Sequence, residues 1–357
     1  MKIKICILIV SILVSLQGWP QPKKSPSFFN LAIQAEEEDM PGTAYMSVDY
    51  TSLGMISMRN YQGSDEQLTT LAKMITELSK QNESAYYKLS NPKDTTLAGS
   101  YSFYSTFLPH ADNPKVVCKV KLGDYSIFYL KLEEGFPLMT FCLKKVNGRW
   151  LNTPFIMEHP AVIAMTDAIN KSYLYPSKFK ATSKLPVPKN TKIRFDSVFG
   201  DPNFGLNFYM NIYKVSYNTK NKNDSTNSYN NALKPCLDFY ANALGLLDQG
   251  KLDSYYLTLS PGSKDRIRKT LNESDNNGLE YFKAFKSSFS KVVYVIDLGE
   301  VKLLLAQNPF FGGKKFYQKI YIRMQPKPNW INEQSEFYLD DLLRLPAFKS
   351  LLFGEGS

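Results

Sequence analysis

Few residues of this chain combine the type and the spacing that catalysis or metal binding requires. The sequence contains two histidines, His110 and His159, too few for a histidine-rich metal centre. His110 follows Pro109 and His159 precedes Pro160, which are positions typical of loops and helix starts. We therefore expect no metal site and no cofactor.

The common catalytic motifs are missing from the sequence. It contains no Gly-x-Ser-x-Gly, no phosphate-binding glycine loop, no dinucleotide fingerprint and no His-Glu-x-x-His. Asp238, near Tyr240 on a predicted helix, is the best candidate for an acid that faces a cavity. A carboxylate on the helix surface is the alternative, because the spacing gives Asp238 no partner. No residue is assigned a catalytic role, and binding is favoured over catalysis.

Aromatic side chains are the second group of candidates. The chain contains 23 Phe and 23 Tyr, and many of them cluster in residues 101–107, 281–289 and 310–321. Core packing explains such clusters, and an aromatic-lined groove for sugar rings, lipid or a peptide is the alternative. In that alternative the ligand-binding residues are Asp238, Tyr240, Tyr101, Tyr104, Tyr281 and Phe285.

Lysines gather in the proline-containing segment 176–191, which contains no acidic residue. The prolines and the charge predict a linker. A docking strip for an anionic surface is the alternative, with Tyr173, Tyr175 and Phe179 interleaved among the lysines. Its binding residues are Lys178, Lys180 and Lys184.

The elements that position these residues are organised around a stretch that occurs twice. Residues 115–130, KVVCKVKLGDYSIFYL, match residues 291–306, KVVYVIDLGEVKLLLA, without a gap. Each copy is typical of a tight β-hairpin whose type II′ turn begins with Gly123 or Gly299. This register places Cys118 opposite Tyr129, and it makes the facing pairs of both copies apolar or aromatic.

The same order of parts surrounds each copy. A helix over 65–89, with Ser64 and Gln67 as a capping box, precedes the first hairpin, and a strand over 138–145 follows it. A helix over 233–250 and a strand over 316–324 flank the second hairpin. Upstream, two short strands are expected within 44–62.

We therefore predict an α+β protein of two similar domains, each a curved antiparallel sheet with helices packed on one face. A hairpin over 192–217, with its turn at residues 201–203, begins the second domain. The predicted segments are a signal peptide (1–18), a flexible leader (19–41), the first α+β domain (42–175), the linker (176–191) and the second α+β domain (192–357).

Charge and cysteine content limit the partners and the disulfides. Removal of Lys2 and Lys4 with the signal peptide lowers the formal net charge from +10 to +8, a basic excess compatible with anionic surfaces or simply with solubility. Cys118 and Cys142 should lie two strands apart, about 9 to 10 Å, which is too far for a disulfide. We expect free thiols at Cys118, Cys142 and Cys236, and no specific binding of nucleic acid.

The first half combines a predicted helix that ends in Tyr-Tyr-x-Leu-Ser at 86–90 with later strands that close on Lys-x-x-Gly-x-Trp at 145–150. This combination resembles the cone-shaped domains of the nuclear transport factor 2-like superfamily. Residues 255–260 and 327–330 repeat the pattern less clearly. The resemblance covers roughly 65–155 and 231–342. Its members range from enzymes that work inside the cone to pure binding modules, so the resemblance implies a fold and leaves the function open.

These observations favour an exported, non-enzymatic binding or interaction protein with two duplicated α+β domains. The expected partner is a protein or a cell-envelope surface component, and no transmembrane segment is expected after signal cleavage. The alternatives are a small-ligand or saccharide-binding protein with an aromatic-lined cone pocket, and a cone-type enzyme. A deep pocket lined by Tyr, Phe and an ionisable group would favour the alternatives, and a filled core would favour the first hypothesis.

The N-terminus generates a prediction about location. An apolar run follows Lys2 and Lys4, and it is shorter than the roughly 20 residues that a spanning helix needs. We expect cleavage between about Leu16 and Gln21 and a secreted or periplasmic protein. N-terminal sequencing of the native protein should begin in that range, and a sequence that starts at Met1 or Lys2 would contradict export.

Overall fold

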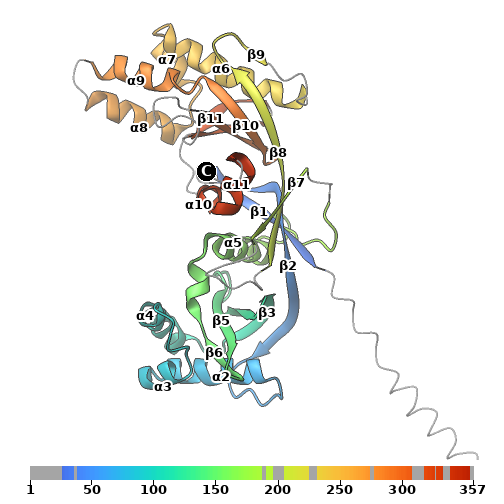
Figure 1. Cartoon of the computed structure of the whole chain (residues 1–357). Helices are drawn as coiled ribbons and strands as arrows, with labels where there is room; N and C mark the ends of the chain where they lie inside the picture. The colour runs from blue at the N-terminus through green and yellow to red at the C-terminus, as the bar shows by residue number, and fades with distance from the viewer. Residues whose placement is uncertain are drawn as a thin grey trace, which may run out of the picture.

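The structure is a computed structural model, and it describes residues 26–35, 38–186, 190–195, 205–224, 231–273, 277–307, 317–325, 327–332 and 338–353. The predicted signal peptide (1–18) and the predicted turn at 201–203 lie outside the described residues. Two lobes are joined by a narrower middle, and one sheet runs through both lobes (Figure 1).

Two long strands at the middle of the molecule join the lobes. They are β2 (Glu38–Ser57) and β8 (Leu206–Asn218), and they pair antiparallel with Met46 opposite Phe208. Within the described residues the sheet contains 13 strands, and its main path runs β13-β12-β11-β10-β8-β2-β3-β4-β5-β6. The prediction of helices with an antiparallel sheet is confirmed.

The first lobe continues from β2. Its other strands are β1 (Ser27–Ala35), β3 (Lys115–Leu122), β4 (Tyr125–Lys131), β5 (Met139–Val146) and β6 (Arg149–Asn152). Its helices are α2 (Glu66–Ser79), α3 (Glu83–Lys88), α4 (Leu97–Phe107) and α5 (Pro160–Leu174). α5 lies at the middle of the molecule, next to β1, whereas α2 to α4 lie at the far end (Figure 1).

The second lobe continues from β8. Its other strands are β7 (Thr191–Phe195), β9 (Asn223–Asp224), β10 (Lys291–Asp297), β11 (Val301–Gln307), β12 (Tyr317–Arg323) and β13 (Trp330–Asn332). Its helices are α6 (Lys234–Asp248), α7 (Leu252–Tyr256), α8 (Pro261–Asn272), α9 (Gly278–Ser287), α10 (Tyr338–Arg344) and α11 (Pro346–Phe353). α10 and α11 lie at the middle beside α5, and α6 to α9 lie at the other end (Figure 1).

The predicted hairpin registers are confirmed. Cys118 faces Tyr129 in the first hairpin, and Tyr294 faces Leu305 in the second. Gly123 and Gly299 have φ values of 54° and 89°, as a type II′ turn requires at its first central position. A β-bulge also interrupts both hairpins at the same place, after Val116 in one and after Val292 in the other.

The central strand pair joins two positions that match each other. Tyr50 of β2 pairs with Val120, and Ile212 of β8 pairs with Ile296, the residue of the second hairpin that matches Val120. Counting back four residues from Tyr50 and Ile212 gives Met46 and Phe208, which pair with each other. The contact between the lobes therefore has the geometry of a local two-fold axis.

Helices cover both faces of each lobe's sheet, so the prediction of helices on one face is wrong. Neighbouring residues of β4 belong to different cores: Phe128 packs in a cluster with α2 to α4, whereas Ile127 packs in a cluster with α5. In β11, likewise, Leu304 packs in a core with α6 to α9, whereas Leu303 packs in the central core. Strands buried on both faces lack strict alternation, so the sequence pattern did not reveal the second helical layer.

The prediction of a flexible leader over 19–41 is wrong for residues 27–35 and 38–41. Residues 27–35 form β1, and 38–41 begin β2. Phe29, Leu31 and Ile33 recur at the period of a strand, and all three are buried in the central core. This pattern outweighs the prolines and acidic residues around it.

Two further predictions require correction. The expected break at 51–53 is absent, because β2 continues through a bulge with positive φ at Gly54 and Met55. The expected helix over 65–89 is two helices, separated at Gln81, whose φ is 56°. Asp65, and not Ser64, caps α2, because its carboxylate accepts hydrogen bonds from the N–H groups of Gln67 and Leu68.

Gly299 generates a prediction about the contact between the lobes. A Cβ at Gly299 would lie 2.8 Å from Cγ2 of Thr43, and Thr43 is held in place because its N–H and hydroxyl donate to the carbonyls of Leu298 and Asp297. Gly148 has a similar φ, +80°, with no described atom within 4 Å of its Cβ position. Gly148→Ala should cost about 1 to 2 kcal/mol of unfolding free energy, and Gly299→Ala about 1 to 3 kcal/mol more.

Chemical denaturation of both variants measures this difference. Thr43→Ser in the Gly299→Ala background should recover part of the loss, because it removes the clashing methyl group and keeps the hydroxyl. Equal losses for the two glycine variants would show that the turn does not press against Thr43.

Candidate functional site

Asp238 and Tyr240 both make structural contacts. The Asp238 carboxylate accepts hydrogen bonds from the Tyr217 hydroxyl and from Nζ of Lys234, each at 2.7 Å. Partial burial acts to raise the pKa of Asp238, but the bonds from Lys234 and Tyr217 outweigh it and lower the pKa. Tyr240 is buried, and its hydroxyl donates to the carbonyl of Phe289 at 3.2 Å. Asp238 is thus ionised, and its bond with Tyr217 connects α6 to β8.

Tyr101 and Tyr104 lie on α4 against the core of the first lobe. The Tyr104 ring stacks on Phe141 with centroids 4.2 Å apart, and its hydroxyl donates to the carbonyl of Thr140 at 2.8 Å. The Tyr101 hydroxyl donates to the carbonyl of Gln81 at 2.9 Å. Both side chains tie α4 to its neighbours, as the core-packing alternative expects.

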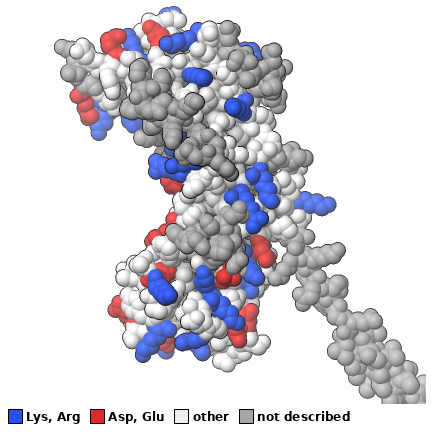
Figure 2. Space-filling model, in the orientation of Figure 1, with Lys and Arg blue, Asp and Glu red and all other residues white. Residues whose placement is uncertain are grey.

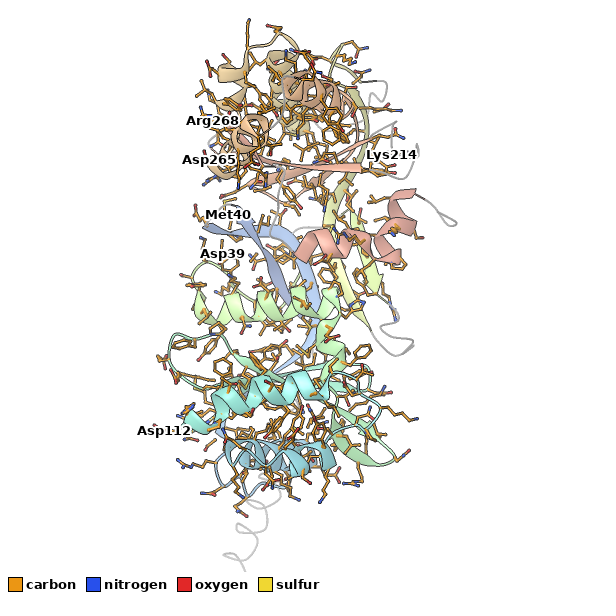
Figure 3. All side chains as sticks on the ribbon, turned by 90° about the vertical axis from the view of Figure 1, so that its left-hand side faces the viewer. Asp39, Met40, Asp112, Lys214, Asp265 and Arg268 are labelled. Atoms are coloured by element: carbon orange, nitrogen blue, oxygen red, sulfur yellow. The ribbon has the colours of Figure 1, made fainter. Side chains whose placement is uncertain are left out.

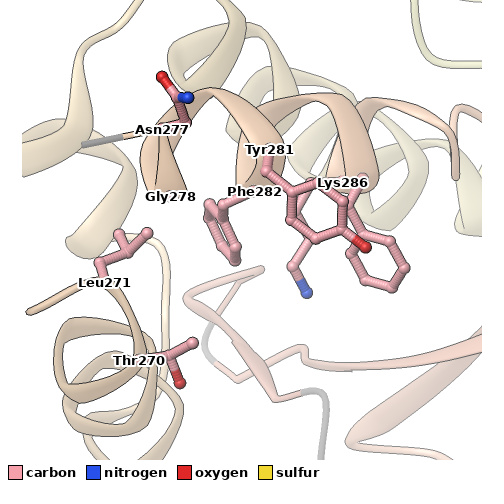
Figure 4. Close-up of a pocket in the computed structure, with 8 residues that line it drawn as sticks. Thr270, Leu271, Asn277, Gly278, Tyr281, Phe282 and Lys286 are labelled. Carbon is pink, nitrogen blue, oxygen red and sulfur yellow. The ribbon is translucent and has the colours of Figure 1, made fainter. Parts of the chain in front are cut away.

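Tyr281 and Phe285 come together at a hollow between α8 and α9 (Figure 4). The hollow has a volume of about 570 Å³. The Tyr281 ring is stacked at 6.5 Å from Phe285, and Tyr281 is 73% exposed. Nζ of Lys286 lies 5.4 Å from the ring centroid of Phe282. This hollow is an open depression, lined by aromatic side chains, on the surface of the second lobe.

A second hollow, which we call the first-lobe pocket, lies between β1, β2, β3 and α5. Its volume is about 410 Å³, within the range of small-molecule sites. The buried side chains of its floor are Phe29, Cys118, Leu138, Ile169 and Phe179. Tyr50, Ser172, Tyr173, Pro176 and Lys180 form its less buried rim.

The two lobes differ in side-chain size at one matched hairpin position, which in the first lobe lies at the pocket. Cys118 and Tyr294 occupy the same position of the two hairpins, immediately after the shared bulge. The Tyr294 ring packs against the central core, and its hydroxyl donates to the carbonyl of Leu352 in α11. The second lobe therefore has a large ring at the position where the first lobe has the small side chain of Cys118.

A rim residue, Tyr50, interacts with Cys118 of the floor of the first-lobe pocket. The Tyr50 hydroxyl and the Cys118 thiol share a hydrogen bond. Burial raises the pKa of Cys118 to about 12, although the bond with Tyr50 acts to lower it, and burial also raises the pKa of Tyr50. A thiol with so high a pKa is a poor nucleophile at neutral pH. Cys118, Cys142 and Cys236 are free, as predicted.

The three lysines of the predicted strip are placed differently from one another. Nζ of Lys178 lies 3.6 Å from Oε1 of Glu38, and Lys180 lies at the rim of the first-lobe pocket. The main-chain carbonyl of Lys184 accepts a bond from the Thr182 hydroxyl at 2.9 Å. Figure 2 shows acidic and basic side chains interspersed over both lobes on the visible face, with basic ones also gathered over the middle.

Part of the predicted linker packs against the first lobe and lines the first-lobe pocket. Phe179 is fully buried, and Phe28 and Thr182 exchange two backbone hydrogen bonds of 2.8 Å. Sequence reasoning missed Phe29, Tyr50 and Cys118 as pocket residues. The signal for Cys118 was present, since the aligned hairpins differ there by a cysteine against a tyrosine.

An ionic cluster lies where β2 begins. Figure 3 shows Asp39 at the middle of the molecule, between the two lobes. Asp39 pairs with Lys171 of α5, and Oε2 of Glu38 lies 3.5 Å from an Arg323 guanidinium nitrogen of β12. Burial raises the pKa of Asp167 to about 6, with nearby Lys171 opposing the rise and Asp39 adding to it.

The described residues contain no group of three or more His, Cys, Asp and Glu side chains that is placed to hold a metal ion. Among the same residues, no helix is long and apolar enough to cross a membrane. Comparison with protein-family models, with curated proteins and with solved structures finds no match for this chain.

Asp167 generates a prediction about pH. Its pKa is about 6 in the folded protein against an ordinary value of 3.8, so the folded state holds the proton more tightly than the unfolded chain. The stabilisation from protonated Asp167 is therefore complete below about pH 4 and is lost as the pH rises through 6. Asp167→Asn, which imitates the neutral form, should raise the unfolding free energy at pH 7.5 by up to about 3 kcal/mol.

Denaturation of the variant and the wild type at pH 4.5 and 7.5 checks this. The gain should be larger at pH 7.5, and the exposed-site control Asp112→Asn should give the same small change at both pH values. A net loss of stability for Asp167→Asn at pH 7.5 would contradict the assigned pKa shift.

Proposed function

We propose that this protein is a non-enzymatic binding protein that holds a small apolar ligand in the first-lobe pocket. One observation carries the proposal: the matched position is Cys118 in one lobe and Tyr294 in the other, and Cys118 is among the residues that line a hollow of about 410 Å³. The pocket has Tyr and Phe walls and an ionisable group, Lys180, at its rim. Such a lining of Tyr, Phe and an ionisable group distinguishes a ligand-binding protein from a protein whose cores are filled.

We also propose that the chain arose by internal duplication of an α+β unit. The support is the common order of elements, the shared bulge, and the pairing of the matching residues Met46 and Phe208. A short parallel bridge also ties the end of a helical segment to the last strand in each lobe, at Ser90 with Asn152 and at Leu259 with Ile331. Export and the likeness to nuclear transport factor 2-like domains stay predictions.

A contact surface for a protein or a cell-envelope component is the second candidate function. The helix before each hairpin presents two aromatic rings one turn apart. On α4 these are Phe103 and Phe107, which are 54% and 48% exposed, and on α9 they are Tyr281 and Phe285. Exposed apolar groups of this kind mark interaction sites when they form a patch. This candidate gains support if the first-lobe pocket takes no ligand.

Binding of the neutral fluorescent probe N-phenyl-1-naphthylamine tests the proposed function. The wild type should bind it, and Cys118→Tyr should lose binding at least tenfold, because the new ring takes up volume at the pocket. Tyr281→Ala, which removes a ring from the α8–α9 hollow, should leave binding unchanged.

Ser172→Trp provides a second way to fill the pocket, from its rim, if Cys118→Tyr does not fold. Circular dichroism and the midpoint of thermal unfolding report whether each variant is folded. Loss of binding in Tyr281→Ala with unchanged binding in folded Cys118→Tyr or Ser172→Trp would refute the proposal.

A further inference from the structure

We propose that two copies of this chain form a closed pair, in which the exposed rings of α4 in each copy enter the α8–α9 hollow of the other. We call Phe103 and Phe107 the α4 ridge. The inference names a partner for the contact surface that is the second candidate function, and it does not depend on a ligand in the first-lobe pocket. It is carried by a ridge at one end of the molecule and a hollow at the other (Figure 1).

The α4 ridge is an exposed apolar surface. Phe103 and Phe107 are 54% and 48% exposed, and their ring centroids lie 5.1 Å apart. The sequence of α4, LAGSYSFYSTF, contains no charged residue. Two adjacent exposed rings on an uncharged helix form an apolar patch of the kind that marks interaction sites.

The α8–α9 hollow lies beside a helix that has no counterpart in the first lobe. In the first lobe, a short turn over 91–96 connects Ser90 of the parallel bridge to α4. In the second lobe, α8 lies between the matching bridge residue, Leu259, and α9. α8 supplies Thr270 and Leu271 to one wall of the hollow, across from the rings of α9 (Figure 4). The two lobes therefore present different surfaces, a ridge in one and a hollow in the other.

The α8–α9 hollow offers open apolar surface to an inserted ring. Tyr281 is 73% exposed, and Leu271, Phe282 and Phe285 are partly exposed. The volume of about 570 Å³ lies within the range of sites that enclose drug-sized molecules. Insertion of the α4 ridge removes apolar surface of both copies from water and allows edge-to-face or offset ring contacts.

Charge favours contact between opposite ends of two copies. Residues 65–112, which include the α4 ridge, contain six Asp and Glu against four Lys. Residues 261–287, which include the hollow, contain six Lys and Arg against four Asp and Glu. A ridge-to-ridge or hollow-to-hollow pair brings like net charge together, whereas a ridge-to-hollow pair brings opposite net charge together.

The pair closes because both surfaces lie on one side of the molecule. α4 lies at one end and α8 and α9 at the other, and all three helices are on the left in Figure 1. A two-fold axis at right angles to the long direction of the molecule then brings each ridge to the hollow of the other copy. The half-exposed rings of one ridge present only roughly 200 Å², against the roughly 1,200 Å² of a stable interface. We therefore expect a reversible pair that depends on both contacts.

Sedimentation equilibrium of the mature chain over a range of concentrations tests the inference. The average mass should rise with concentration toward that of two chains and no further. The ridge variant, Phe103→Ser with Phe107→Ser, and the hollow variant, Thr270→Trp, which places a ring in the hollow, should each weaken association at least about tenfold. Tyr175→Ser removes a ring that is 50% exposed at the end of α5, and this matched control should associate as the wild type does.

An equimolar mixture of the ridge variant and the hollow variant identifies the contact. A mixed pair retains one intact contact, between the ridge of the hollow variant and the hollow of the ridge variant. The mixture should therefore associate more strongly than either variant alone and less strongly than the wild type. Higher salt should weaken association of the wild type. Tyr281→Ala provides a second change to the hollow if circular dichroism shows that Thr270→Trp does not fold.

The contrary outcomes are distinct. A single-chain mass at every soluble concentration would overturn the pair. Association that is lost in the ridge variant, retained in a folded hollow variant and not recovered by mixing would show a ridge-to-ridge contact and would also overturn it. Masses above that of two chains would overturn closure. Binding of N-phenyl-1-naphthylamine tests the first-lobe pocket separately, and the ridge variant should bind the probe as the wild type does.

Discussion

The structure depends on the antiparallel pairing of β2 with β8, which places Met46 opposite Phe208. This pairing joins the strands of both lobes into one sheet and leaves a common apolar face at the middle of the molecule. Two helices cover this shared face. α5 packs next to β1, and α11 packs next to β7. The inner faces of both hairpins therefore share one core with three helices, while the outer faces have cores of their own.

The local two-fold geometry of this contact constrains the pocket. Cys118 and Tyr294 both follow the bulge of their hairpins, and each hairpin pairs with one of the two central strands. In the first lobe, Cys118 lines the pocket together with Phe29 and Phe179. In the second lobe, Tyr294 instead reaches α11.

The hairpins were predictable because their pairing is local. The turn glycines and the apolar pairs lie within a few residues of one another, and two copies agree on one register. The contact of Met46 with Phe208 was not predictable, because neither residue has a pattern that selects a partner far away in the chain. β1 was missed because acidic and proline residues surround its short alternating run, and the break at Gln81 because helical spacing of apolar residues continues across it.

The candidate site was predicted only at its margin. Lys180 was named from a run of charge, whereas Phe29, Tyr50 and Phe179 come from segments that the fold alone brings together. Asp238 and Tyr104 were reasonable candidates by residue type, yet each is satisfied by a neighbour, Lys234 and Thr140 respectively. Residue type identifies groups able to do chemistry, and the tertiary partners decide whether those groups are available for it.

The central claim is that the first-lobe pocket at Cys118 takes an apolar ligand and that the matching place at Tyr294 does not. A crystal structure of the protein under xenon pressure tests it directly, because xenon occupies apolar cavities. The account predicts xenon density against Cys118 and Phe179 and none against Tyr294. Density at both places, or at Tyr294 alone, would contradict it.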